Sequence, residues 1–252
     1  MTKSTLLSRG ARAVCFAALA TAGLSSTAAT AATYAAIQDT TIYQPIGNLG
    51  ANFGTGGDSG GIQFWNHEAG NGAQALIQFD SAWMNDPLLS GNFVATLNVY
   101  ELCQLGGFVQ ACPGEPGAES TTTDLFIQDS AWSELDPALG WDDVTNTGEF
   151  ASFTQTGNTG WLQIDVTNLI QSILQNGVDY GFAISQEAYP VVRNDNGDLA
   201  ISTFCDSESS FGFCSTGDFT PFLEIRAVPL PAAAWLFLAA LGSLGVARRR
   251  SA

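Results

Sequence analysis

Residues 93–101 read FVATLNVYE, and this stretch decides the fold class. The residues at odd positions from 93 to 99 are apolar, whereas the even positions include Thr96, Asn98 and Tyr100. Apolar residues at every second position are typical of a β-strand that packs one face on a core and turns the other toward solvent. The stretch therefore predicts a half-buried strand.

Similar runs rich in Thr, Val, Ile and Phe recur along the chain, and turns that draw on its 27 glycines separate them. The predicted strands are residues 36–43, 75–79, 93–101, 123–128, 160–166, 180–185, 199–204 and 221–227. Many short strands at this spacing predict an all-β, jelly-roll-like β-sandwich.

One segment, residues 165–177 (DVTNLIQSILQNG), follows a helical period instead. Its apolar residues recur at intervals of three and four, which is typical of an amphipathic helix. Thr167 or Asn168 is expected to cap the start of this helix, and Asn176-Gly177 to end it. The sequence therefore predicts one short amphipathic helix of about ten residues against the sandwich.

Residues 1–31 have the features of a secretory signal peptide. Three basic residues precede an apolar run over residues 13–24, and Ala29-Thr30-Ala31 matches the A-x-A cleavage pattern. We expect this segment to be removed on export, so that the mature chain begins at Ala32.

Residues 228–252 form a second predicted targeting segment. Their parts, in order, are Val228-Pro229-Leu230-Pro231, the uncharged apolar run 232–247, and Arg248-Arg249-Arg250. A helix over the apolar run would reach about 24 Å, slightly less than the apolar core of a bilayer. The positive-inside rule places the three arginines in the cytoplasm. The sequence therefore predicts a short C-terminal transmembrane helix, and a plain tail anchor is the alternative interpretation.

The order of these three parts resembles the PEP-CTERM sorting tail of Gram-negative, exopolysaccharide-producing bacteria. This resemblance implies that an exosortase-type transpeptidase is a partner that cuts near the proline motif and discards the helix, as in other removed anchors. Here Pro229-Leu230-Pro231 stands where the family has Pro-Glu-Pro. The implied location is an inner-membrane-anchored precursor, followed by the cell surface or extracellular matrix.

The region between the two predicted targeting segments, residues 32–227, has the length of one domain. All 24 Asp and Glu residues lie in it together with only Arg193 and Arg226, so it carries 24 negative and 2 positive charges, a net charge of −22. Such a surface repels nucleic acid and anionic polysaccharide. It keeps a secreted protein soluble and would also attract Ca²⁺.

Four cysteines lie in this domain, in two pairs of identical spacing: Cys103 with Cys112, and Cys205 with Cys214. Each pair encloses a loop rich in Gly, Ser or Pro, and an oxidising compartment favours pairing within each loop. We therefore expect two local disulfides.

A second resemblance extends over most of residues 33–226. The segments DTTIYQ, ALIQFD, VATLNVYEL, DSAWSE, GWDD, WLQIDVTNLIQSIL and TPFLEIR follow one another as in the DNRLRE-type β-sandwich domains of secreted proteins. Some of those domains are classed as carbohydrate-binding modules for acidic polysaccharides. Since such ligands call for Lys and Arg, the two arginines of this domain predict no direct binding of uronic-acid polymers unless Ca²⁺ forms a bridge.

Tryptophans are candidate platforms for sugar rings. Trp65 lies beside His67 in a Gly-rich stretch, and these two residues are the candidate ligand contacts. Trp161 lies in a predicted strand and is expected in the core, and Trp132 and Trp141 are expected to pin their long loop to the sandwich.

Asp195, Asn196 and Asp198 form the candidate metal site. Oxygen side chains around a glycine can wrap Ca²⁺, but a β-hairpin turn built on Asn-Gly explains the same residues. Both interpretations fit the sequence.

The sequence offers no established catalytic motif, and the many carboxylates do not by themselves indicate a glycosidase. We therefore expect an exported, non-catalytic protein of the surface or exopolysaccharide matrix, with carbohydrate as a candidate ligand. The alternatives are a structural or adhesive matrix protein without a defined ligand and a polysaccharide-active enzyme.

Overall fold

The computed structural model describes residues 30–44, 47–48, 61–64, 72–102, 121–155, 159–186, 202–207, 214 and 218–228. All the elements below lie within the compact unit Ala31–Ala227. Residues 1–29 and 229–252, which hold nearly all of the predicted signal peptide and sorting tail, lie outside the described residues. No helix of the described residues is long and apolar enough to cross a membrane.

The described part of the chain is all-β with a single α-helix, which confirms the predicted class. Its strands are β1 (Ala31–Tyr43), β2 (Gly47–Asn48), β3 (Ile62–Phe64), β4 (Ala73–Phe79), β5 (Phe93–Leu102), β6 (Thr121–Ile127), β7 (Phe150–Gln155), β8 (Gly160–Asp165), β9 (Phe182–Ser185), β10 (Ser202–Phe204) and β11 (Phe222–Ala227). The helix α3 spans Thr167–Asn176, and the short 3-10 helices are η1 (Ser81–Asn85), η2 (Pro87–Ser90) and η3 (Trp141–Asp143).

Each predicted strand corresponds to an observed one, whereas β2, β3 and β7 were not predicted. β2 and β3 contain only two and three residues, which is too few for a periodic signal. In β7 the buried positions include Gln155, and Phe150 is exposed. This reversal hides the apolar alternation.

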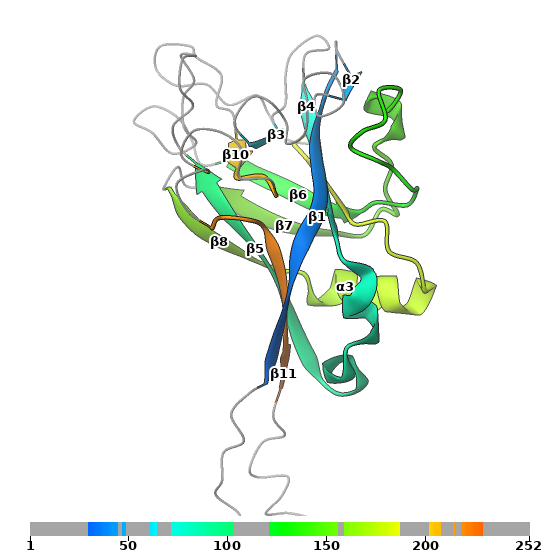
Figure 1. Cartoon of the computed structure of the whole chain (residues 1–252), viewed down its shortest axis with the longest axis vertical. Helices are drawn as coiled ribbons and strands as arrows, with labels where there is room; N and C mark the ends of the chain where they lie inside the picture. The colour runs from blue at the N-terminus through cyan, green and yellow to red at the C-terminus, as the bar shows by residue number, and fades with distance from the viewer. Residues whose placement is uncertain are drawn as a thin grey trace, which may run out of the picture. The chain divides into compact units, whose positions relative to one another are not determined.

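β1 is the longest strand and belongs to two sheets (Figure 1). Its first residues, from Ala31 to Ala35, pair with β11, and its remainder pairs with β4. The register shifts between Ala36 and Gln38, and the intervening Ile37 is 58% exposed. An extra residue of this kind bends a strand and increases its twist, which turns β1 from one sheet into the other.

We call the two sheets A and B. Sheet A contains β3, β10, β5, β8, β11 and the first part of β1, and sheet B contains β2, β4, β9, β6, β7 and the rest of β1. All pairs are antiparallel. β5 is central in sheet A, because Glu101 faces Gly160 of β8 on one side and Phe204 of β10 on the other.

One apolar core lies between the sheets. Ala95, Leu97 and Val99 of β5 are buried in it, so the inward face predicted for residues 93–101 is confirmed. The rings of Phe64 from sheet A and Phe153 from sheet B meet across it, with centroids 6.2 Å apart. A single cluster that draws residues from both sheets indicates a sandwich-like arrangement.

Helix α3 adds its apolar stripe to the same core, with Leu169, Ile170 and Ile173 buried. It has ten residues and ends at Gly177 in the left-handed conformation, as predicted. The predicted cap at Thr167 or Asn168 is wrong. Thr167 is the first helical residue, its backbone N–H donates to Asp165 Oδ1 at 2.9 Å, and its hydroxyl accepts a bond from Ala95 N at 3.0 Å.

The turn before β9 is built around a half-buried carboxylate. Asp179 accepts bonds from the indole N–H of fully buried Trp83 at 2.7 Å and from Gly181 N at 2.8 Å. Burial raises the pKa of Asp179 above its usual value, and the two donors partly oppose this effect. Gly181 has φ +82°, and a Cβ there would meet the carbonyl oxygen of Ile77 at 2.2 Å.

We expect Gly181→Ala to destabilise the domain by several kcal/mol, because it adds a backbone clash to left-handed strain. Gly148→Ala is the matched control, since Gly148 has φ +83° but open space around its Cα. That variant should lose only about 1 kcal/mol. Urea unfolding of both variants measures the difference, and equal losses would contradict the role of the Ile77 carbonyl.

A pH dependence follows from Asp179. Because its pKa is raised in the folded state, the protonated form is favoured there, and this contribution to stability is present at low pH and is lost as pH rises through the folded pKa. We expect the unfolding free energy of the wild type, relative to Asp179→Asn, to increase as pH is lowered from 7 toward 4. The asparagine does not titrate. A difference that shrinks on acidification would refute the assignment.

Candidate functional site

Four aromatic rings form a continuous group on the side of sheet A that faces away from the core. They are Tyr100 of β5, Trp161 of β8, Phe222 of β11 and Phe219, which lies just before β11, and we call them the aromatic strip. Tyr100 stands directly opposite Trp161 in the β5–β8 register. Val99, which directly precedes Tyr100 in β5, is in the core. Because neighbouring side chains of a strand point to opposite faces, Tyr100 and the strip lie on the outer face.

The rings of the strip hold one another in place. The Trp161 centroid lies 5.4 Å from that of Tyr100 and 5.3 Å from that of Phe222, and both contacts are edge-to-face. Tyr100 and Phe219 are closer, with centroids 4.1 Å apart. Such contacts add to apolar burial and fix the ring planes.

Trp161 is 45% exposed, so its predicted position in the core is wrong. It shares a face of β8 with Gln163 and Asp165, both exposed, whereas Ile164 on the other face is buried. The polar neighbours at alternate positions were the signal for this orientation. The size and hydrophobicity of tryptophan had favoured the opposite interpretation.

A disulfide supports one end of the strip. Cys205 and Cys214 are bonded, with their Cα atoms 5.5 Å apart, which confirms this predicted pair. The two cysteines and Leu102 form a small buried cluster, and Tyr100 and Phe219 pack against it. Cys103 and Cys112, the other predicted pair, lie outside the described residues.

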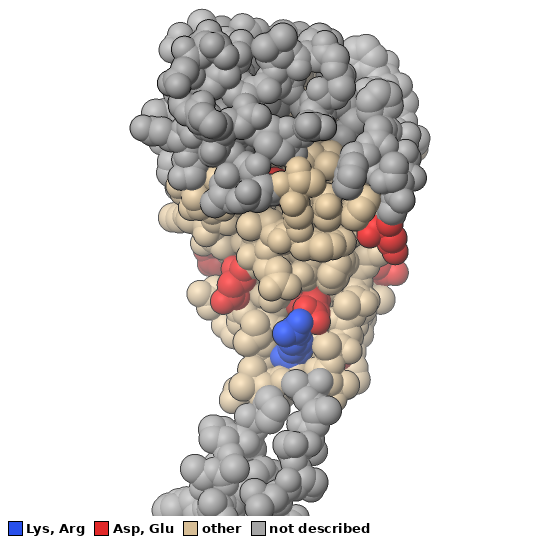
Figure 2. Space-filling model, turned by 90° about the vertical axis from the view of Figure 1, so that its left-hand side faces the viewer, with Lys and Arg blue, Asp and Glu red and all other residues tan. Residues whose placement is uncertain are grey.

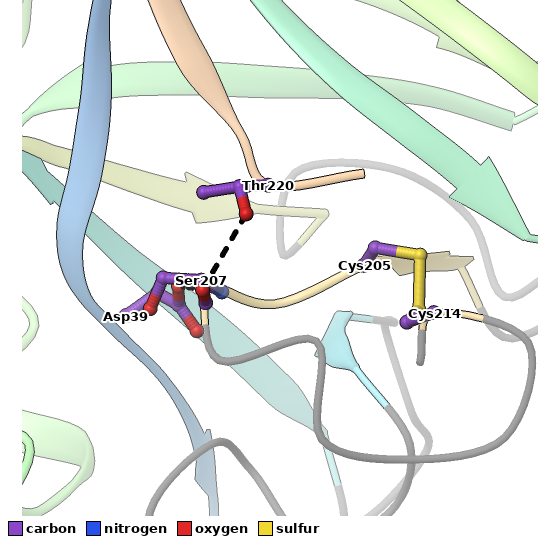
Figure 3. The surroundings of a disulfide bond; sticks show 5 residues. All are labelled: Asp39, Cys205, Ser207, Cys214 and Thr220. Carbon is purple, nitrogen blue, oxygen red and sulfur yellow. Dashed lines mark hydrogen bonds between the residues drawn. A yellow bond between two sulfur atoms is a disulfide. The ribbon is translucent and has the colours of Figure 1, made fainter. Parts of the chain in front are cut away.

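Hydrogen bonds tie the segment that follows Cys205 to its neighbours. Cys205 N donates to the carbonyl oxygen of Tyr100 at 3.0 Å, and Ser207 N donates to Asp39 Oδ2 of β1 at 2.7 Å. The Thr220 hydroxyl donates to the carbonyl oxygen of Ser207 at 3.5 Å (Figure 3). The backbone below Tyr100 and Phe219 is therefore fixed to β5, to β1 and to the segment just before β11.

Amide groups lie next to the rings. The side-chain amide of exposed Gln163 donates to Asn98 Oδ1 at 3.0 Å, and Asn98 in turn donates to the carbonyl oxygen of Thr96 at 3.2 Å. These bonds orient Gln163 one register position from the strip, at the place opposite Asn98. An oriented amide can both donate to and accept from hydroxyl groups of a ligand.

The basic side chain beside the strip is paired with a carboxylate, and exposed Asp165 adds a negative charge on the same face. Arg226, the only basic residue among those described, donates to Glu224 Oε2 at 2.8 Å. This bond and the charge of Glu224 raise the pKa of Arg226. Figure 2 shows a face on which one basic side chain meets an acidic one, with further acidic side chains among uncharged residues. The face therefore has little electrostatic preference for an anionic polymer.

The other candidate residues of the sequence fall elsewhere. Trp65, His67 and the predicted calcium loop Asp195, Asn196 and Asp198 lie outside the described residues. Among the residues that are described, no cluster of three acidic, His or Cys side chains is suited to a metal.

The loop tryptophans were expected to pin their loop to the sandwich. Trp132 is half-buried, and its indole N–H donates to the carbonyl oxygen of Tyr180 at 2.8 Å, as expected for a pinning residue. Trp141 is also half-buried, in η3.

No protein-family model matches this sequence, and a comparison with curated proteins finds no significant relative. A fixed, exposed tryptophan ring beside an oriented amide is suited to stacking on the apolar face of a sugar ring while the amide binds its hydroxyls.

We expect the double variant Cys205→Ser, Cys214→Ser to lose about 2–3 kcal/mol of stability, because the unfolded chain gains freedom. It should also mobilise the strip, since Tyr100 and Phe219 pack on the disulfide cluster. Thermal unfolding checks the first effect and tryptophan fluorescence anisotropy the second. An unchanged melting temperature would show that the bond adds nothing to the fold.

Proposed function

We propose that this protein is an exported, non-catalytic glycan-binding protein that holds neutral polysaccharide on the aromatic strip. The observation that carries the proposal is the exposure of Trp161 while Tyr100 and Phe222 hold its ring edge-to-face. A ring that is fixed and still open to solvent can offer its exposed surface to a ligand.

Rigidity matters here because sugars bind weakly. A free tryptophan would lose rotamer entropy on binding, which commonly amounts to about 0.5–1.5 kcal/mol for an interface side chain. The ring contacts and the cluster around the disulfide already restrict the rotamers of Trp161 in the folded protein, so this entropy is lost on folding and not on binding. Stacking on Trp161 would therefore contribute more of its energy to affinity.

The choice of a neutral polymer rests on charge. The region between the two predicted targeting segments, residues 32–227, has 24 acidic and 2 basic residues, and Arg226 is already paired with Glu224. Anionic chains would be repelled by the protein as a whole. The predicted calcium loop, if it binds Ca²⁺, would offer a separate route to acidic polysaccharides.

We further propose that the protein acts at the surface or in the exopolysaccharide matrix of a Gram-negative bacterium. The proposal is supported by the signal-peptide pattern, the PEP-CTERM-like tail with its expected exosortase-type partner, and the resemblance to jelly-roll-like DNRLRE domains. Cleavage after Ala31 would remove only the first residue of β1. The folded unit would thus remain intact in the mature protein.

Retention in gels that contain neutral polysaccharides tests the function, with the protein produced from its full chain. We expect Trp161→Ala to weaken retention by about tenfold or more, since an anchoring aromatic contributes on the order of 1.4 kcal/mol. Leu135→Ala is the matched control, because Leu135 is 64% exposed and lies in the loop between β6 and β7, whereas Trp161 lies in β8. It should bind as the wild type does.

The same assay separates the alternatives. If the wild type is retained by no polysaccharide, with or without Ca²⁺, the protein is better explained as a structural or adhesive matrix component. Release of sugar products would indicate an enzyme. Equal retention of the wild type and Trp161→Ala would exclude the strip as the binding surface.

A further inference from the structure

We propose that the outer face of sheet B carries a second site, for one uncharged sugar residue, and that the domain can therefore bridge two polysaccharide chains. The site itself is argued from its own geometry. The bridging rests on the proposed function of the aromatic strip.

The site is a hollow of about 280 Å³ over sheet B. Phe126 and Ala183 contribute apolar surface to it, and Gln74, Asp124, Asn146 and Ser185 contribute polar groups. Sites for drug-sized ligands run from about 300 to 1,000 Å³, so this hollow suits a ligand of one ring. Apolar surface with a few convergent polar groups is the usual composition of a ligand site.

The aromatic floor is held by a neighbour. The ring centroids of Phe126 and Phe150 lie 5.7 Å apart, and the two residues stand opposite each other on β6 and β7. Phe150 is 56% exposed, so this pair extends the apolar surface beyond the hollow. A sugar ring above Phe126 would present its C–H groups to the aromatic face.

The carboxylate of the hollow is also positioned. Asp124 is 6% exposed, and its Oδ1 accepts a bond from the Ser152 hydroxyl at 2.6 Å. In the β6–β9 register Asp124 stands opposite Ser185, which brings a carboxylate and a hydroxyl together. Carboxylates accept strong hydrogen bonds, and the hydroxyls of a sugar are suitable donors.

The wall that carries Asn146 is fixed before any ligand arrives. Buried Gln128 donates to the carbonyl oxygen of Asp143 at 3.0 Å and accepts from Thr145 N at 3.1 Å. On the other side, Thr147 N donates to the carbonyl oxygen of Ile127 at 3.2 Å. Asn146 thus lies between two residues whose backbones are bonded to the sheet. Such preorganisation lowers the entropy lost on binding.

The charge of the site selects the class of ligand. Asp124 would repel phosphates and uronic acids, and the only described basic residue, Arg226, belongs to sheet A. A metal ion would find a single carboxylate, since the described residues hold no cluster of three metal-binding side chains. The remaining polar groups are two amides and a hydroxyl, which favour an uncharged, hydroxyl-rich ligand.

The two sites lie on opposite outer faces of the sandwich. Leu125 and Ile127 of β6 are in the core. Asp124 and Phe126 alternate with them along the strand and therefore point away from the core. Tyr100 points away from the same core on sheet A. One glycan bound on each face would link two chains through a single domain.

The test uses the protein from its full chain and the methyl glycosides of glucose, galactose and mannose, followed by amide NMR shifts. In Trp161→Ala, which isolates the second site, we expect at least one glycoside to shift residues around Asp124. Adding Asp124→Asn, or separately Asn146→Ala, should raise the Kd at least tenfold. Asn146→Ala guards against misfolding of the buried variant, and Leu135→Ala should change nothing.

Bridging is read from the turbidity of neutral polysaccharide mixed with protein. The wild type should give a maximum at intermediate protein concentration, and both Trp161→Ala and Asp124→Asn should abolish it. If no glycoside shifts the residues around Asp124, the second site is wrong, whatever the strip does. If glycosides bind there and Trp161→Ala leaves turbidity unchanged, the strip and the bridging are wrong.

Discussion

The structure depends on one strand that serves two sheets. β1 pairs with β11 along its first residues and with β4 along the rest, and the register shift beside Ile37 lets it turn between them. Backbone hydrogen bonds are satisfied on both sides of that turn, because each half of the strand finds its own partner. Without this shared strand, only the segments that connect other strands would join sheets A and B, and no hydrogen-bonded strand would run from one sheet into the other.

The outer faces of sheets A and B differ in how far other parts of the chain cover them. On sheet B, the loop over residues 128–149 packs Leu139, Trp132 and Val144 against Ile42 and Leu76 and encloses a hollow beside them. On sheet A, Trp161 of the aromatic strip is exposed, whereas Tyr100, Phe219 and Phe222 are half-buried. The two proposed sites differ accordingly, since one is an exposed ring on an open strand face and the other is a hollow with room for a single sugar ring.

Much of this fold could be predicted from alternation alone. Residues 93–101 indicated both the strand β5 and its buried face, and the period of residues 165–177 indicated α3 and its end at Gly177. What alternation does not reveal is which face of an amphipathic strand is inward when both carry large side chains. Trp161 was misplaced for that reason, although Gln163 and Asp165 on the same face pointed outward.

The hollow was beyond prediction, because Gln74, Asp124 and Ser185 come together only through the registers of β4, β9 and β6. No local pattern marks such residues.

The first and last strands of the folded unit also determine how it would respond to force. Ala31 stands opposite Arg226, so the chain enters and leaves at the same end of the domain (Figure 1). Tension applied between these two points would load the β1–β11 hydrogen bonds one at a time, as a zipper opens, and not all together in shear. If the domain were attached through only one terminus, no tension would act between Ala31 and Arg226, and the β1–β11 hydrogen bonds would carry no force.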